Sequence, residues 1–314
     1  MTLRLLVVGA AAGGGLPQWN CNAPNSAALW RGTAPFAPAT QSSLAVTLAE
    51  PGNTDADWAL INASPDLRAQ IMANPELQPR DPARHGLRDT PIRSVLLTNG
   101  DIDHVAGLLT MREKQAFDLW ATGEIAGVLD ANPIFGALDP ALVTRHVARL
   151  EEPAEILPGL TATLFAVPGK VALYLEGAHG GDAVATDLEG EQTVGVELAA
   201  GGGRAFYIPG CARLTEGVRA RLDGAALVLF DGTVFHDDEM IRAGVGTKTG
   251  GRMGHMAMAG PGGSMAAFAG LDIARKVYVH INNTNPVWDP ASPERAEVEA
   301  AGWEVAHDGM KLAL

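Results

Sequence analysis

Cysteine and basic residues are scarce in this chain of 314 residues. Cys21 and Cys211 are its two cysteines, and they lie far apart, which excludes the dense disulfide framework of small secreted domains. Cys211 follows an expected strand and is expected to be a small buried side chain. Lysine and arginine total 23 against 36 acidic residues, a formal net charge of −13. This balance argues against a nucleic-acid partner, which requires a basic face.

Long apolar runs are also missing. No run approaches the roughly 18 residues needed to span a membrane. Residues 2–9 are apolar with one basic residue and lead into glycines, so we expect a first strand and a turn rather than a signal peptide. We therefore expect a cytoplasmic protein without a membrane partner. With 47% hydrophobic and 19% charged residues, residues 1–314 are expected to form one globular domain.

Short segments rich in β-branched residues and leucine alternate with segments of helical periodicity, in two similar halves. This order predicts an α/β fold, an αββα sandwich of two mixed β-sheets with helices on the outer faces. A doubly wound sheet is the competing fold, but the strand-to-strand steps over 160–208 count against it. Ser64 and Pro65 are typical of a helix start, and the aperiodic run 176–192 predicts a long surface loop. The expected strands are 2–9, 42–49, 58–62, 92–98, 160–166, 171–175, 193–198, 204–208, 226–230, 276–281, 303–306 and 310–313, and the expected helices are 64–73, 105–115, 215–222, 262–269 and 293–301.

The sharpest chemical feature is N-G-D-I-D-H at 99–104, between an expected strand and an expected helix. Asp101, Asp103 and His104 offer carboxylate and imidazole ligands, which suit Fe(II), Mn(II) or Zn(II). Asp103 is equally suited to cap the following helix. The spacing alone leaves a metal site and a helix cap as alternatives.

Three further segments carry candidate site residues. His280 ends an apolar strand, where it is either a ligand or a core histidine bonded to the backbone. His255 lies between glycines at 251–256 and is either a close-approach loop residue or simply exposed. Asp231 ends a strand, as a turn residue or as a partner that orients a ligand histidine. The remaining histidines are expected to be surface or structural residues: His85, His146, His179, His236 and His307.

The order of these pieces resembles the metallo-β-lactamase superfamily, whose metal motif is H-x-H-x-D-H after a strand. The matching positions are Asn99, Asp101, Asp103 and His104, so the first two histidines are replaced. Later segments lack the superfamily's further histidine and its bridging aspartate. The resemblance therefore implies half of a two-metal site and argues against a hydrolase. Asp103, His104 and the late His280 form the ligand set of the non-haem Fe(II) oxygenases.

The chain more closely resembles one family, the pyrroloquinoline quinone (PQQ) biosynthesis protein B family. The resemblance covers almost the whole chain and implies the metallo-β-lactamase-like αββα sandwich. It rests on long runs in the right order: A-A-G-G-G-x-P-Q-W-N-C at 11–21, T-Q-S-S at 40–43, N-A-S-P-D-x-R at 62–68, D-x-D-H-x-x-G-L-L at 101–109, D-G-T at 231–233, G-V-G-T-K-T-G at 244–250, G-H at 254–255, H-I-N-N-T-N-P at 280–286 and S-P-E-R-A at 292–296.

This resemblance implies a role in making PQQ from a precursor peptide in which a Glu and a Tyr are cross-linked. The implied activity is Fe(II)- and O₂-dependent hydroxylation of the tyrosine ring, alongside other PQQ pathway enzymes. The alternative for the family is a non-catalytic carrier that transports PQQ or its precursor to the periplasm. Zn or another divalent ion shares such ligands, and the sequence is compatible with a homodimer.

The resemblance also implies roles for individual residues. The implied metal ligands are Asp103, His104 and His280, and the implied acid–base or orienting groups are His255, Asp101 and Asp231. Because a carboxylate-rich substrate requires local cations in an acidic enzyme, arginines are expected near the site. The weaker substrate-binding candidates are Asn62, Asp66, Arg68 and Arg252, with Arg112 as a further arginine.

One departure from the family concerns a structural zinc held by cysteines in many members. Ala23 and Ser26 stand where further thiols are expected, and Cys21 is left alone. One thiolate does not close a tetrahedral zinc site. We therefore expect no structural zinc, and a loop over 17–32 that is ordered by its own packing, for instance through Trp19 and Trp30.

Overall fold

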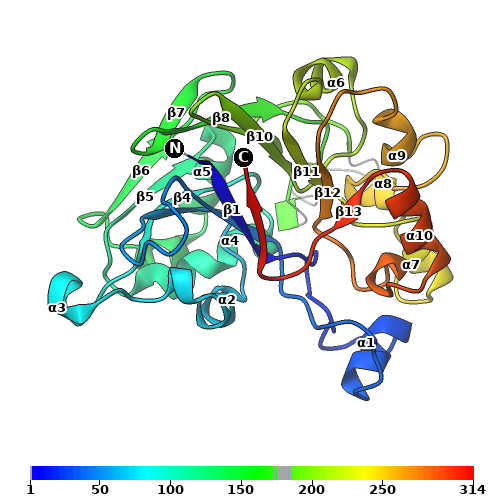
Figure 1. Ribbon diagram of the computed structural model, residues 1–314, viewed down its shortest axis with the longest axis horizontal. Coiled ribbons are helices and arrows are strands. Elements are labelled where there is room, and N and C mark those ends of the chain that lie inside the picture. Colours follow the sequence, from blue (N-terminus) through cyan, green and yellow to red (C-terminus); the bar gives the residue numbers. More distant parts are fainter. Residues whose placement is uncertain (1, 173, 176–184) are drawn as a thin grey trace.

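Two seven-stranded β-sheets pack face to face in the computed structural model, which describes residues 2–172, 174–175 and 185–314 (Figure 1). The first sheet has the order β14-β1-β2-β3-β4-β5-β6 and the second β13-β12-β11-β10-β9-β8-β7. Each sheet contains both parallel and antiparallel strand pairs, so both sheets are mixed, as expected. The strands are β1 Arg4–Gly9, β2 Ser43–Thr47, β3 Trp58–Ile61, β4 Ile92–Leu96, β5 Phe117–Ala121, β6 Val143–Val147, β7 Pro153–Leu157, β8 Leu160–Ala166, β9 Val194–Ala200, β10 Gly203–Ile208, β11 Leu227–Asp231, β12 Lys276–Val279, β13 Glu304–Val305 and β14 Met310–Ala313.

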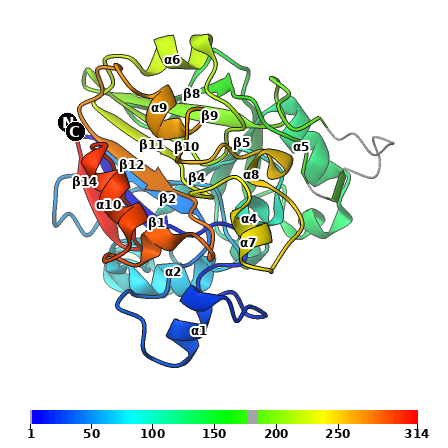
Figure 2. The same cartoon turned by 90° about the vertical axis from the view of Figure 1, so that its right-hand side faces the viewer.

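Short helices cover the outer faces of both sheets, which confirms the αββα sandwich. Helices α6, α9 and α10 lie beside the second sheet, whereas α1 stands apart at the bottom in both ribbon views (Figures 1 and 2). The α-helices are α1 Pro24–Trp30, α2 Leu67–Ala73, α3 Pro82–His85, α4 Ile102–Val105, α5 Gly123–Asp130, α6 Glu216–Leu222, α7 Glu239–Arg242, α8 Gly250–Met253, α9 Ser264–Ala267 and α10 Pro293–Ala300, and 3₁₀ segments include Pro75–Leu77, Ala106–Arg112, Pro133–Ala137 and Pro286–Trp288.

The central strands read as continuous apolar runs because both of their faces are buried. On β1, Leu5 and Val7 pack into the core between the sheets, whereas Leu6 and Val8 pack under the helices of the first sheet. Successive side chains of a strand point to opposite faces, so one strand serves both cores. This burial makes the two sheets a rigid support for the loops at their ends.

Two expected elements have different boundaries in the structure. The expected helix 105–115 is instead α4, which begins at Ile102, followed by the 3₁₀ segment Ala106–Arg112. The expected helix 64–73 begins only at Leu67, because the Ser64 hydroxyl accepts a hydrogen bond from the Asp66 N–H at 3.2 Å and closes a turn there. Pro65 therefore lies before the helix and not in its first turn.

The expected strand 171–175 is wrong for its described part. Residues 171–172 and 174–175 are not strand, and the Leu175 N–H bonds to the Ala172 carbonyl in a turn at 2.8 Å. Strand β8 already pairs with β7 and β9, so both of its edges are occupied. Of the expected loop 176–192, residues 176–184 and His179 with them lie outside the described residues, and 185–192 run without a named strand or helix.

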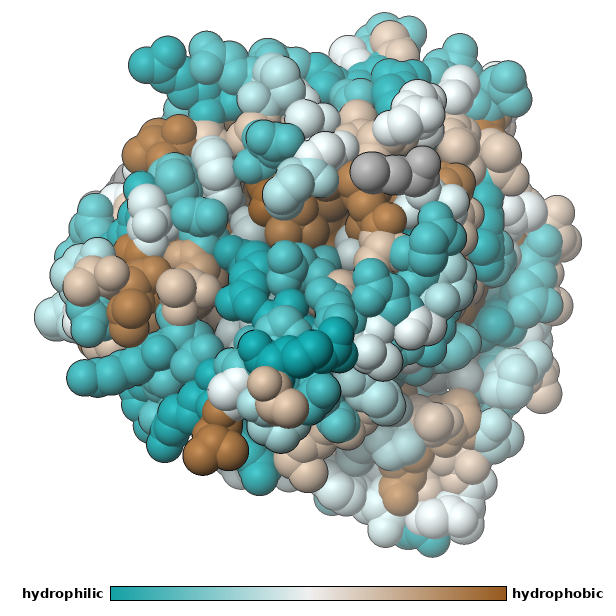
Figure 3. All heavy atoms as spheres, turned by 60° about the vertical axis from the view of Figure 1, so that its left-hand side comes forward, coloured by the Kyte–Doolittle hydropathy of each residue, from teal (hydrophilic) through white to brown (hydrophobic). Residues whose placement is uncertain are grey.

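Hydrophilic side chains predominate on the face in Figure 3, and hydrophobic ones gather there in separate small patches. Such scattered exposure is ordinary for a protein surface. Within the described residues, no helix combines the length and the apolar character needed to cross a membrane.

Candidate metal centre

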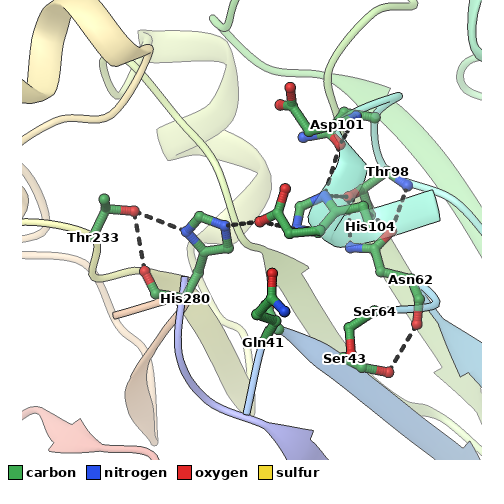
Figure 4. Close-up of polar contacts among 12 residues, drawn as sticks. Gln41, Ser43, Asn62, Ser64, Thr98, Asp101, His104, Thr233 and His280 are labelled. Carbon is green, nitrogen blue, oxygen red and sulfur yellow. Dashed lines mark hydrogen bonds and ion pairs between the residues drawn. The ribbon is translucent and has the colours of Figure 1, made fainter. Parts of the chain in front are cut away.

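Polar side chains from both sheets converge at the ends of β4, β11 and β12. His104 lies on α4, shortly after β4, and His280 directly follows β12. Figure 4 shows the two imidazoles facing each other, with Thr233 behind His280 and Thr98 beside His104. The carboxyl ends of neighbouring parallel strands meet at one edge of a sheet, which brings distant residues together there. Asp103 and His280, 177 positions apart in the chain, thus share one site.

Asp103, His104 and His280 form a compact donor set. The Asp103 Oδ2 atom lies 3.1 Å from His280 Nε2 and 3.8 Å from His104 Nε2. One donor atom from each residue lies within 4.8 Å of the others. Two imidazoles and a carboxylate at this spacing are suited to a single divalent ion with open coordination positions.

His104 presents an unprotonated nitrogen to the site. Asn99 Oδ1 accepts the Asp101 backbone N–H at 3.0 Å, which identifies that atom as the amide oxygen. The same oxygen lies 2.7 Å from His104 Nδ1, so Nδ1 carries the proton and Nε2 carries a lone pair. His104 Nε2 is buried, and none of the described residues provides a hydrogen-bond partner for it. A buried polar atom without a partner is costly unless a ligand or ion satisfies it, so the residues present fit a metal.

A threonine orients His280 in the same way. The Thr233 hydroxyl donates a hydrogen bond to Asp231 Oδ1 at 2.7 Å. The Thr233 oxygen therefore accepts the hydrogen bond from the Nδ1–H group of His280 at 2.9 Å. His280 Nε2 is then left to face Asp103. The His280 backbone has a φ of 55°, a left-handed conformation that costs about 1 kcal/mol or more in a non-glycine residue.

Asp231 holds His255 rather than a metal. Its Oδ2 accepts the Cys211 N–H at 2.9 Å and the His255 Nδ1 at 2.7 Å. Its Oδ1 accepts both the backbone N–H and the hydroxyl of Thr233. Asp231, His255 and His280 also lie close enough to hold an ion, but these four hydrogen bonds occupy the fully buried Asp231 carboxylate. We therefore assign Asp231 as a partner that orients His255.

Burial and charge determine the protonation of the donor set. Burial lowers the pKa of His104 to about 4, so the ring is neutral at pH 7. Burial also opposes the charged form of His280, but the hydrogen bond to Asp103 outweighs it and raises the pKa of His280. Burial would raise the pKa of Asp103, yet His104 and His280 hold it below its ordinary value. Asp103 is thus a carboxylate that attracts a cation to the two imidazoles.

A cavity of about 330 Å³ opens beside the donor set. Its lining includes Asp101, Asp103, His255 and His280 together with Lys170 and Lys248. Its volume is at the small end of the range for small-molecule sites. The site therefore combines a candidate metal-binding set, a histidine whose Nδ1 is held by Asp231, and room for a small ligand.

Comparisons with known proteins bear on the family of this chain. Residues 57–281 match the family described as "Beta-lactamase superfamily domain". Coenzyme PQQ synthesis protein B of Methylobacterium radiotolerans is 53% identical over 312 residues, covering 99% of this chain and 100% of that protein. Its counterpart in Xanthomonas euvesicatoria is 51% identical over 313 residues, with the same coverage. This chain belongs to the coenzyme PQQ synthesis protein B family.

A crystal structure from the same family extends the match to three dimensions. Zn(2+)-bound PqqB from Methylobacterium extorquens superimposes with a TM-score of 0.92 at 52% identity, covering 99% of this chain and 100% of that one. A diphosphatase of the PhnP family, 20% identical with a TM-score of 0.67 over 100% of this chain and 98% of that one, shares the fold. The superfamily fold and the PQQ synthesis protein B family expected from the sequence are thus confirmed.

Several residues singled out from the sequence do not line the cavity. Asn62 is buried and exchanges hydrogen bonds with Thr98, so it supports the segment that leads to Asn99. Asp66 accepts hydrogen bonds from the Gln41 backbone and side chain. The arginines expected near the substrate also lie outside the lining: Arg68 is exposed, Arg112 pairs with Glu113, and Arg252 lies on α8 near the cavity.

Sequence reasoning missed the two lysines of the cavity. Lys248 lies within G-V-G-T-K-T-G, a motif that carried the family resemblance without any assigned role. Lys170 ends F-A-V-P-G-K at 165–170, one of the later segments that lack the superfamily's further histidine, and it was likewise given no role. The rarity of lysine in this chain is the signal that could have found both.

The 17–32 loop is ordered differently from expectation. Trp19 is 84% exposed, so it does not pack the loop, and Trp30 is 54% exposed although its Nε1 donates to the Cys21 carbonyl. Asn25 instead donates to the carbonyls of Asn283 and Asn285 at 3.0 and 2.9 Å. The loop is therefore tied to the segment that follows His280.

Proposed function

We propose that this protein acts in PQQ biosynthesis as an iron- and O₂-dependent hydroxylase of the tyrosine ring in the Glu–Tyr cross-linked precursor. Family membership supports the pathway. The observation that carries the chemistry is the set Asp103, His104 and His280, where the part of the chain that the structure describes offers no hydrogen-bond partner to the buried Nε2 of His104. Fe(II) held by these residues would supply the reduction of O₂, and a relative in the family binds Zn²⁺ in its crystal structure.

The chain's own residues position the ligands and move a proton. Asn99 and Thr233 hold the two imidazoles with Nε2 toward the site. His255 lines the cavity, and its Nδ1 is committed to Asp231, so its Nε2 is free to accept the phenol proton of the ring. The buried Asp231 carboxylate stabilises the imidazolium that results. Asp101, at the same cavity, is a second acid–base group within reach of a substrate.

The dimensions of the cavity favour a small substrate. About 330 Å³ accommodates cross-linked amino acids more readily than a long peptide. The thioethers of Met240 and Met253 contribute apolar wall against which a ring can pack. We therefore place the excised cross-linked amino acids, rather than the intact precursor peptide, as the substrate.

The test is O₂ consumption by Fe(II)-loaded protein with a Glu–Tyr cross-linked substrate and ascorbate as reductant. Each oxygen added converts a ring C–H into C–OH, consumes one O₂, two electrons and two protons, and releases one water. We expect mass gains of one and two oxygens, lost in Asp103→Ala and His280→Ala but retained in the surface control His307→Ala. Full activity in His280→Ala would contradict the proposed ligand set. Tight binding without mass change, at confirmed iron content, would instead favour a carrier.

A further inference from the structure

Asn282 connects the segment after His280 to the cavity beside the donor set. It lies two positions beyond His280, lines the cavity and is only 8% exposed. Its backbone is held on both sides, since its N–H donates to the Thr233 carbonyl at 3.0 Å and its carbonyl accepts the Trp288 Nε1–H at 2.8 Å. A buried side chain on a fixed backbone loses little further freedom when a ligand binds, so Asn282 is suited to recognition.

A buried glutamate sets the direction of the hydrogen bonds that reach Asn282. Glu239, the first residue of α7, is buried, and its Oε2 accepts the Phe235 N–H at 2.7 Å. Burial raises the pKa of Glu239 to about 7, so well above that pH the group is a carboxylate without a proton to donate. The Thr284 hydroxyl lies 2.6 Å from Glu239 Oε1 and therefore donates to it.

That hydrogen bond decides which end of the Asn282 amide is turned toward Thr284. A hydroxyl has one proton, and Thr284 uses it for Glu239, so its Oγ1 accepts from Asn282 Nδ2 at 2.7 Å. The amide oxygen Oδ1 is then the end that remains for the cavity. Within the part of the chain that the structure describes, no residue donates a hydrogen bond to Asn282 Oδ1. A largely buried acceptor without a protein donor indicates a donor on the ligand.

We infer that Asn282 is a specificity-determining residue whose Oδ1 accepts a hydrogen bond from a ring hydroxyl of the ligand, and that Glu239 and Thr284 are positioning residues that keep this oxygen toward the cavity. The choice of a ring hydroxyl as the donor rests on the proposed function, whose substrate is a phenol. The recognition itself does not depend on hydroxylation, because a carrier of the same compound would use it equally.

Two probes that differ at one ring substituent test the inference: 3-(4-hydroxyphenyl)propionate, whose hydroxyl can donate, and 3-(4-methoxyphenyl)propionate, whose ether oxygen can only accept. Calorimetric titration of Zn(II)-loaded protein measures binding without turnover, so failure of the hydroxylase proposal leaves this test intact. At about pH 8.5 Glu239 is charged while the phenol keeps its proton. We expect the wild type to bind the hydroxyl probe about tenfold more tightly, because the methoxy probe leaves the Asn282 oxygen without a donor.

Asn282→Leu removes the amide and keeps a side chain of similar size. Its affinity for the hydroxyl probe should fall about tenfold, and its affinity for the methoxy probe should stay within about twofold, so the preference disappears. Zinc content and thermal midpoint are measured first for this and every other variant. Equal affinities of the wild type for the two probes would overturn the inference. A preference that persists in Asn282→Leu would do so as well, because it would reflect the size of the methoxy group.

Glu239→Gln is the sharper test, because it reverses the hydrogen bonds without changing the shape of the side chain. The new amide oxygen remains the acceptor for the Phe235 N–H, so the new NH₂ group donates to Thr284. The Thr284 hydroxyl then donates to Asn282 Oδ1, and Nδ2 turns toward the cavity. Since both probes can accept from Nδ2, the preference should fall to within about twofold, and the methoxy probe should bind more tightly than to the wild type.

Two further variants separate this reversal from a loss of charge or of folding. Thr284→Val removes the hydroxyl that fixes the amide, so the preference should also fall there, even if Glu239→Gln does not fold. Glu294→Gln, in the first turn of α10, removes a charge that acts on Glu239 through space, and it should keep the preference of the wild type. Retention of that preference in folded, zinc-loaded Glu239→Gln or Thr284→Val would overturn the positioning role.

Discussion

At the scale of single residues, neighbouring oxygens determine which nitrogen each site histidine presents. Asn99 accepts a hydrogen bond from the Nδ1–H group of His104. Thr233 does the same for His280, and Asp231 for His255. In each case Nε2 is the nitrogen left toward the site. Partners that orient ligand imidazoles in this way typically contribute 10- to 100-fold to metal affinity.

Thr233→Val should weaken metal binding about 10- to 100-fold while Thr233→Ser stays close to wild type. Valine keeps the shape but removes the oxygen that accepts from His280 Nδ1 and donates to Asp231. Competition with a chromophoric chelator measures the affinity for Zn(II). Equal affinities of the Val and Ser variants would show that the hydroxyl does not orient His280.

The stability of the metal-free protein should fall as the pH falls from 6.5 to about 4, in part because of His104. Burial lowers the pKa of folded His104 to about 4, whereas the unfolded ring titrates near 6.5. Between these values the unfolded state binds the proton and the folded state does not, so acid favours unfolding. Below about pH 4 both states are protonated and this contribution levels off.

His104→Gln removes that titration and should flatten the pH dependence over the same interval. Urea unfolding in the presence of a chelator, at several pH values between 7 and about 4, gives the free energy of unfolding for both proteins. The other titrating groups are shared, so the difference in slope reports His104. Parallel curves for the two proteins would contradict the assignment of a lowered pKa.

At the scale of elements, the missed segments are those whose burial is partial or whose caps are weak. Strands β6 and β7 each lie at one edge of a sheet, and most of their side chains are exposed or half-buried instead of forming an apolar run. Helix α1 follows Ala23, which provides no capping side chain. By contrast, residues 171–172 and 174–175 are apolar without being strand, and the preceding strand β8 is already paired on both sides with β7 and β9. Whether a strand lies at the edge of a sheet depends on how the whole sheet is assembled, so the local sequence pattern does not predict it.

The element that carries Asp103 and His104 depends on close packing against the 63–64 turn. A Cβ at Gly107, in the 3₁₀ segment after α4, would overlap the carbonyl of Ser64 and the backbone of Ala63. Gly107→Ala should therefore destabilise the protein by about 1–3 kcal/mol and weaken metal binding, since α4 has to shift.

Gly127→Ala is the matched control for this prediction. Gly127 lies in α5, where a Cβ would meet nothing within 4 Å. The substitution should leave metal binding unchanged and add up to about 1 kcal/mol of stability through helix propensity. Urea unfolding and chelator competition compare the two variants. Similar stabilities for both would show that the packing at Gly107 is not limiting.

At the scale of the whole molecule, the chain closes on itself around the site. Strand β14 pairs with β1, and the Ile281 N–H bonds to the Ala10 carbonyl at 2.9 Å, so the start of the chain braces the residue after His280. Asn25 holds the same region from α1. The candidate metal ligands thus come from the first third of the chain and from near its end, and the first residues of the chain support the segment around His280.

The sequence by itself determined the two-layer fold, and it pointed to the residue types of the candidate metal centre. Buried strands can be recognised in the sequence as apolar runs, and Asp103, His104 and His280 lie in motifs that are local in sequence. Only the tertiary structure decided which histidine nitrogens face the site, that Asp231 holds His255, and that Lys170 and Lys248 share a cavity while the expected arginines do not line it. These are distances between segments far apart in the chain, and they depend on how both sheets pack, which no local pattern encodes.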